Sequence, residues 1–172
     1  MSESEQQRTL RVAEGKALSD KDLQRMCNKA GVKVNILMYD QLKDMNFDQL
    51  LSKTPLIMLL NIVGDNAPKV GHWIAFLSYN GQLEHFDSYG LRPDQELHIT
   101  HEQPYLTRIL RGQRYETNHV QLQEKKDHVN TCGRHCVSRI LMKQMRQRQY
   151  VRWLTSQHEK PDLTVTLKTL HL

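Results

Sequence analysis

The chain has 172 residues, which is enough for one domain with a substantial hydrophobic core. It carries 24 Lys and Arg against 19 Asp and Glu, and this net charge of +5 fits weak attraction to a polyanion without identifying a nucleic-acid-binding protein. Its three cysteines are an odd number, which excludes a fully paired disulfide framework and points to a reducing compartment.

The N-terminus is polar and contains no apolar targeting segment. Residues 1–8 lack the apolar core of a signal peptide, and the longest apolar run, residues 55–63, is too short to span a bilayer. We therefore expect a soluble intracellular protein that is not secreted and has no membrane partner. We divide it into a polar N-terminal segment over residues 1–17, which we expect to be frayed or loosely attached, and a single domain over residues 18–172.

The first predicted elements are helices followed by a buried strand. Ser19 is a suitable N-cap for a helix that continues through Lys29, with acidic residues in its first turn. A short helical piece is predicted over residues 47–51. The continuous apolar run over residues 56–63 has the length of a strand that is buried on both faces.

A hairpin is predicted next. Residues 72–79 and 82–87 are predicted strands, and Asn80-Gly81 between them favours a two-residue hairpin turn. With that turn, residues equally far from it face each other, so His72 lies opposite the position two residues after Asp87. We therefore expect the side chains of His72 and Asp87 to lie within reach of each other at one end of the sheet.

The second half of the chain alternates helical and extended patterns. Residues 103–110 predict a helix, residues 115–123 a further strand, and residues 137–145 an amphipathic helix. Residues 150–154 continue a helical pattern, and Pro161-Asp162 can start a last short helix. This order predicts an α+β fold with an antiparallel-containing central sheet.

Cys132 lies at or just before the start of the helix that follows it. The partial positive charge of a helix N-terminus favours a thiolate over a thiol, and Gly133 leaves no side chain between the sulfur and an approaching backbone. Cys132 is therefore a candidate nucleophile. Cys136 falls one turn later on the apolar face and is predicted to be a packing residue.

Two other interpretations of this cysteine remain open. A lone cysteine at a helix start is more often a small buried residue than a catalyst. Cys132 and Cys136, with His128 and His135 nearby, also suggest a zinc site. A closed zinc site usually needs a second ligand pair far away in the sequence, and Cys27 stands alone, so we expect no metal.

A thiolate nucleophile needs a base nearby, and the base needs a group that holds its tautomer. Of nine histidines, His72 is the strongest candidate base because it stands at a strand start, where Trp73 can cover one side. Asp87 is the natural orienting group because the hairpin places it near His72. The alternative is that these two residues lie at the end of a hairpin without a catalytic role.

An oxyanion hole needs preorganised hydrogen-bond donors beside the sulfur. The backbone N–H of Cys132 is one candidate. A glutamine side chain from the preceding segment is another, and Gln123 and Gln121 are both available there. Exposed strand glutamines without a catalytic role are the alternative interpretation.

These residues, taken in order, resemble a known family. The segments Gly71-His72-Trp73-Ile74, His85-Phe86-Asp87-Ser88-Tyr89-Gly90, Gln123 and Asn130-Thr131-Cys132-Gly133 look like the adenain and ubiquitin-like-protein protease group of cysteine peptidases. The resemblance covers roughly residues 55–145. It implies His72 as base, Asp87 as orienting group, Cys132 as nucleophile and Gln123 as oxyanion donor.

The resemblance also implies the fold and leaves one assignment open. In this group, a central mixed, largely antiparallel sheet packs against a buried helix that carries the nucleophile. The glutamine of the group usually stands closer to the cysteine than the nine positions that separate Gln123 from Cys132. Either the loop is longer here, or Gln121 or another group is the donor.

The compact chain is most similar to maturation proteases of large DNA viruses, virophages and related mobile elements. This implies a monomeric cysteine endopeptidase with no required cofactor. Its substrates would be capsid or core precursors, cleaved after small residues, often Gly, in a narrow channel formed with Trp73. A viral protein of this kind is expected in the virion and the host-cell interior, and a cellular one in the cytoplasm or nucleus.

Three alternative functions follow from the same residues. The protein could deconjugate SUMO or ubiquitin-like modifiers, or it could be a catalytically silent module of the same fold that binds a ubiquitin-like tail or capsid protein. It could also bind DNA, which the resemblance suggests as a candidate activator, although a solvated helix face explains the same charges. The basic residues concerned are Arg108, Arg111, Arg114, Lys143, Arg146, Arg148 and Arg152.

Overall fold

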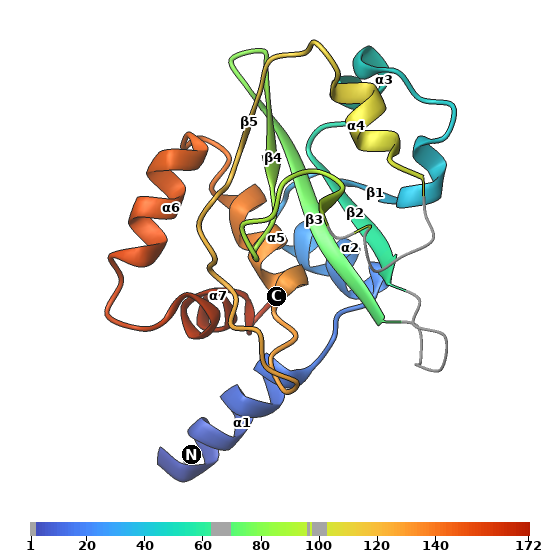
Figure 1. Ribbon diagram of the computed structural model, residues 1–172. Coiled ribbons are helices and arrows are strands. Elements are labelled where there is room, and N and C mark those ends of the chain that lie inside the picture. The colour runs from blue at the N-terminus through green and yellow to red at the C-terminus, as the bar shows by residue number, and fades with distance from the viewer. Residues whose placement is uncertain (1–2, 63–69, 96, 98–102) are drawn as a thin grey trace.

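The computed structural model of the protein describes residues 3–62, 70–95, 97 and 103–172. It has the predicted α+β fold, with helices around one central sheet (Figure 1). The helices of the described residues are α1 (Glu3–Gly15), α2 (Asp20–Lys29), the 3-10 helix η1 (Tyr39–Leu42), α3 (Phe47–Ser52), α4 (Tyr105–Leu110), α5 (Cys132–Leu141), α6 (Gln147–Thr155) and α7 (Pro161–Thr169). None of these described helices is long and apolar enough to cross a membrane.

The sheet is mixed, and its strand order follows the chain. The strands are β1 (Asn35–Met38), β2 (Leu56–Ile62), β3 (Val70–Tyr79), β4 (Gln82–Phe86) and β5 (Tyr115–Thr117). The central strands β2, β3 and β4 pair antiparallel, whereas the edge strands β1 and β5 run parallel to their neighbours. The longest pairings are therefore antiparallel, as the sequence predicts.

The β3–β4 hairpin has the predicted register. Tyr79 pairs with Gln82, and the turn residues Asn80 and Gly81 both have positive φ, 48° and 78°, as a type I′ turn requires. Because β4 is shorter than β3, β3 continues past the end of β4. His72 lies in this overhang, close to the point where β4 ends and the loop after it begins.

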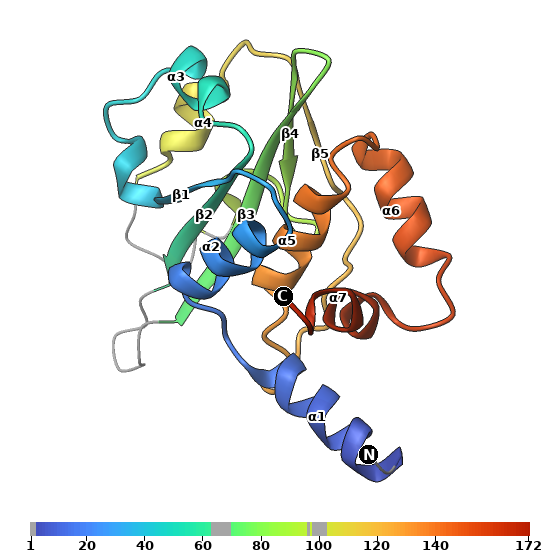
Figure 2. The ribbon, with the colours of Figure 1, turned by 180° about the vertical axis from the view of Figure 1, so that it is seen from behind.

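Side chains that alternate along β3 enter two separate apolar cores. Trp73, Ala75 and Leu77 pack with residues of α2, α5, α6 and α7. Ile74 and Phe76 pack on the other face with residues of η1, α3 and α4. Figure 2 shows α2 and α5 in front of the sheet. Since β2 also contributes to both cores, its predicted burial on two faces is confirmed.

The strand predicted over residues 115–123 is too long, because β5 covers only the first three of these residues. The Asn118 side chain donates to the carbonyl of Val120 and accepts the N–H of Val120, each at 2.9 Å, so local bonds replace the ladder. The chain then runs beside the loop after β4, where Gln123 donates its backbone N–H to the carbonyl of Ser88 at 2.9 Å.

The N-terminal segment is more ordered than predicted. Most of its described residues form α1, which projects from the body of the molecule (Figures 1 and 2). Asn130 donates its backbone N–H to the carbonyl of Glu14 and its side-chain amide to the carbonyl of Gly15, each at 2.8 Å. These bonds attach the end of α1 to the loop before α5. The segment is therefore helical and not frayed, whereas its mostly exposed surface fits the alternative of a loosely attached segment.

The burial of α5 also differs from an amphipathic helix. Every residue from Cys132 to Ile140 is buried, including the charged residues Arg134 and Arg139. Arg139 forms an ion pair with Glu84 of β4, and both side chains are almost completely inaccessible. Polar partners from other elements therefore allow the second face of this helix to be buried.

We expect the Glu84→Ala variant to lose about 3–5 kcal/mol of unfolding free energy, because it leaves the Arg139 charge buried without its carboxylate. Equilibrium unfolding in guanidinium chloride measures this difference. Asp44→Ala removes an exposed carboxylate and serves as the matched control, with an expected change within about 0.5 kcal/mol. Equal stability of the two variants would contradict a structural role for the ion pair.

Candidate active site

The end of the β3–β4 hairpin brings His72 and Asp87 together. Nε2–H of His72 donates to Oδ1 of Asp87 at 2.9 Å, and the two side chains are 4% and 0% exposed. The same Oδ1 accepts the backbone N–H of Tyr89 at 2.7 Å, which fixes the orientation of the carboxylate. The predicted proximity of these two side chains is confirmed.

Cys132 is the first residue of α5, and its side chain lies close enough to His72 to raise the pKa of the imidazole. Because Nε2 of His72 is bonded to Asp87, Nδ1 is the ring nitrogen left for the thiol. All three cysteines are free. Cys132 is 8% exposed, whereas Cys27 and Cys136 are 0% exposed, so Cys132 is the most accessible thiol and Cys136 packs in the core as predicted.

The electrostatics of this group favour a protonated imidazole. Burial alone would lower the pKa of His72, but the hydrogen bond to Asp87, the charge of Asp87 and the Cys132 side chain together raise it to about 10. Burial raises the pKa of Cys27 to about 11 and the pKa of Cys136 well above its ordinary value. The structure therefore places a cation beside Cys132 and keeps the other two thiols protonated at neutral pH.

Gln123 is buried beside this group and held on three sides. Its Oε1 accepts from the hydroxyl of Ser88 at 2.7 Å, and its Nε2 donates to Oη of Tyr89 and to the carbonyl of Val129, each at 3.2 Å. The Tyr89 ring stacks on the ring of His72, with centroids 4.7 Å apart and 18° between the planes. Gln123 is therefore linked through Tyr89 to His72 and through Val129 to the segment that enters α5.

Gln121 occupies a different position from Gln123. Its side chain is exposed, and its Nε2 donates to the backbone carbonyl of Gln123 at 3.0 Å. The structure thus brings Gln123, and not Gln121, into the buried network around His72. Whether Gln123 donates to an oxyanion stays a prediction.

Trp73 lies on the other face of β3 from His72. It is 5% exposed, its Nε1–H donates to the carbonyl of Leu18 at 2.9 Å, and it belongs to the same apolar core as Cys132. The indole is therefore held in place beside α5. Its role in a substrate channel stays a prediction.

Two glycines permit close approaches around the site. A Cβ on Gly133 would lie 3.0 Å from Leu23 and 3.3 Å from Leu18, so this glycine serves the packing of α5 against α2 and the residues before it. Gly90 has a φ of 70°, and a Cβ there would lie 2.7 Å from the carbonyl carbon of Val120. The loop after β4 therefore fits against the segment that leads to Gln123.

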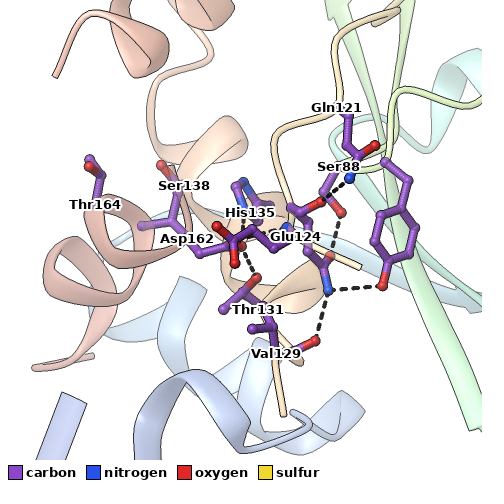
Figure 3. A network of polar contacts seen from close by, with 12 residues as sticks. Ser88, Gln121, Glu124, Val129, Thr131, His135, Ser138, Asp162 and Thr164 are labelled. Carbon is purple, nitrogen blue, oxygen red and sulfur yellow. Dashed lines mark hydrogen bonds and ion pairs between the residues drawn. The ribbon is translucent and has the colours of Figure 1, made fainter. Parts of the chain in front are cut away.

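Two residues at this site were missed by the sequence analysis. Tyr89 could have been found, because it stands two positions after Asp87 in the same turn. Asp162 gave no such signal, because it lies far along the chain at an ordinary helix start. Its carboxylate is bonded to the hydroxyl of Thr131, to Nε2 of His135 at 3.0 Å and to the backbone N–H of Glu124 at 2.8 Å (Figure 3).

The structure also shows where the candidate metal ligands and several of the basic residues considered for DNA binding lie. Over the described ranges, no group of three or more His, Cys, Asp or Glu residues could hold a metal ion. Of the predicted basic patch, Arg148 and Arg152 line a cavity of about 880 Å³ between β5 and α6, together with Arg92. Arg108 instead donates to backbone carbonyls next to η1, where it joins α4 to that segment.

A cysteine at a buried helix start, next to a hydrogen-bonded His–Asp pair, is the arrangement that nucleophilic catalysis by a thiol requires. No protein-family model matches the chain. The chain is 30% identical over 178 residues to the Uncharacterized protein V9 of Sputnik virophage, an alignment that covers 94% of this chain and 98% of the relative. The chain belongs to the same family as this virophage protein. This similarity indicates a viral or virophage origin.

We expect iodoacetamide at neutral pH to label Cys132 in the folded protein and to leave Cys27 and Cys136 unmodified, because burial keeps their pKa values high. Mass spectrometry of the digested protein identifies the labelled peptides. The Cys132→Ala variant should take up no label until it is unfolded in urea. Equal labelling of the three thiols in the folded wild-type protein would contradict the assignment.

Proposed function

We propose that the protein is a cysteine endopeptidase with Cys132 as nucleophile, His72 as general base and acid, and Asp87 as the group that orients His72. The observations that carry this proposal are the 2.9 Å hydrogen bond between His72 and Asp87 and the position of Cys132 at the start of α5, close enough to His72 to raise the pKa of its imidazole. The ordered similarity of these residues to adenain-like proteases supports the same conclusion.

Acylation begins from the ion pair in which the Cys132 proton has already passed to His72, because the raised pKa of the imidazole favours the imidazolium. The thiolate attacks the carbonyl carbon of a peptide, and a C–S bond forms while the carbonyl oxygen takes the electron pair of the broken π bond. His72 then gives its proton to the leaving amine as the C–N bond breaks. Asp87 stays ionised throughout and holds the imidazole with Nδ1 toward the sulfur.

Deacylation reverses these roles with water as the nucleophile. His72 takes a proton from water, hydroxide attacks the thioester carbonyl, and the Cys132 thiolate leaves as the acid product forms. The backbone N–H of Cys132 is the oxyanion donor at the helix start. Both N–H groups of the Gln123 amide are engaged at 3.2 Å, so Gln123 becomes a donor by exchanging one of these long bonds for the oxyanion.

The proposed substrates are capsid or core precursor proteins of a virus, cleaved at small-residue or Gly-containing sites in the virion or host-cell interior. The virophage relative supports the viral context. The low exposure of Cys132, 8%, and the indole of Trp73 packed in the same core support a narrow approach that suits small side chains. Cleavage of a ubiquitin-like fusion in preference to a virion precursor would count against this substrate class.

We expect Cys132→Ala to abolish cleavage of a fluorogenic peptide or a purified precursor, because no other group can form the acyl-enzyme. Asp87→Asn should lower kcat/KM on the order of a hundredfold or more, because it removes the charge that stabilises the imidazolium. Cys136→Ala is the matched cysteine control and should retain cleavage. Full activity of the Cys132→Ala variant would exclude the mechanism.

The activity should also depend on pH through His72. The imidazolium must supply a proton to the leaving amine, so kcat/KM should hold above neutrality and fall as the pH rises through the His72 pKa of about 10. Because Asp87 raises this pKa, Asp87→Asn should move the alkaline decline to lower pH. An alkaline limb at the same pH in both proteins would show that His72 is not the group that titrates.

A further inference from the structure

We propose that Asp162 is a positioning residue for the reaction, which holds the start of α5 and the segment after Gln123 in one fixed arrangement. This inference rests on the proposed function. Asp162 is the second residue of α7 and is 4% exposed. The N-terminus of α7 favours a negatively charged side chain at this position.

One oxygen of Asp162 accepts hydrogen bonds from residues on both sides of Cys132 in the chain. Oδ1 accepts from the hydroxyl of Thr131, the residue before Cys132, and from Nε2 of His135 at 3.0 Å, one turn into α5. Figure 3 shows Asp162 between α7 and the first turn of α5, with Thr131 and His135 directed toward it. Rotation or translation of the helix start would break both bonds.

The bond to Asp162 changes what Thr131 does for its own helix. A threonine at the N-cap normally accepts the N–H of a residue in the first turn. Thr131 is the N-cap of α5 but makes no side-chain bond to the helix, and its hydroxyl is directed at Asp162. An N-cap side chain normally binds the N–H of the second or third helical residue. Here it binds neither, so these N–H groups and the adjacent N–H of Cys132 are left for another acceptor such as a substrate oxyanion.

The second oxygen of Asp162 holds the segment that carries the other candidate donor. Oδ2 accepts the backbone N–H of Glu124, the residue after Gln123, at 2.8 Å. Gln123 is further held by the bond from its N–H to the carbonyl of Ser88 at 2.9 Å. A single carboxylate thus sets the separation between the Cys132 N–H and the Gln123 amide, which must converge on one oxygen atom.

The test compares two reactions of Cys132 that differ in their need for an oxyanion hole. Alkylation by iodoacetamide needs only the thiolate, because displacement at its saturated carbon develops no oxyanion. Peptide cleavage, and the addition of the thiol to a peptide aldehyde, place a negative or hydroxyl oxygen where the two donors meet. A positioning role changes the second class of reaction and spares the first.

Asp162→Asn keeps the shape of the side chain but replaces one acceptor oxygen with an NH2 group, so one arm of the network is lost. We expect kcat/KM for the peptide and the affinity for a peptide aldehyde each to fall by about tenfold to a hundredfold. The iodoacetamide rate at Cys132 should stay within about twofold of the wild-type rate, since His72 and Asp87 are untouched.

Two further variants keep the outcome decisive. Glu159→Gln removes the same charge from an exposed side chain just before α7 and should change neither reaction. Thr131→Val loses only the hydroxyl bond and should give a smaller loss with the same selectivity, and it carries the test if Asp162→Asn does not fold. Unchanged peptide cleavage and aldehyde affinity in both network variants would overturn the proposal.

A structural role alone would give a different pattern. Thermal stability, cleavage and alkylation would then fall together in Asp162→Asn, and that result also overturns the proposal. If the wild-type protein cleaves no peptide, the proposed function fails. The ratio of aldehyde affinity to alkylation rate would still report whether Asp162 positions the two donors.

Discussion

Burial of α5 on every side is the constraint on which the rest of the structure depends. A helix in that position must find a partner for each polar side chain it carries, because an unpaired buried polar group costs more than its burial contributes. The partners come from four other elements and thereby fix where those elements lie. They are the carbonyl of Ala13 and the hydroxyl of Thr169 for Arg134, Asp162 for His135, Tyr150 for Ser138 and Glu84 for Arg139.

This arrangement makes α5 a rigid support for Cys132. The start of the helix is held from α7 through Asp162, and the loop before it is held from α1 through Asn130. The sheet contributes the other half of the site, because β3 extends beyond β4 and carries His72 to where the helix begins. The site therefore forms where the start of α5 meets the part of β3 that extends beyond β4.

The parts of the site that follow from local rules could be predicted, and the rest could not. The Asn80-Gly81 turn sets the register of its hairpin, so the proximity of His72 and Asp87 can be counted along the sequence. The early end of β5 could not be predicted in this way. Side-chain hydrogen bonds of Asn118 replace strand pairing there, and the alternation of apolar residues does not reveal them. The contact of Asp162 with the start of α5 depends on how α7 packs against α5. This is a tertiary contact, and the periodicity of apolar residues in the sequence does not reveal it.

Cys132 and Cys136 show how this framework separates two thiols on one helix. They lie one turn apart, yet Cys136 is enclosed by apolar side chains that raise its pKa, whereas Cys132 has a helix start and a charged imidazole beside it. In the proposed peptidase, the difference in reactivity between the two thiols therefore comes from their positions within the core and not from exposure, since even Cys132 is only 8% exposed. For the proposed peptidase, access to the sulfur then becomes the selective step, and an extended chain with small side chains meets that restriction with the least displacement of the surrounding core.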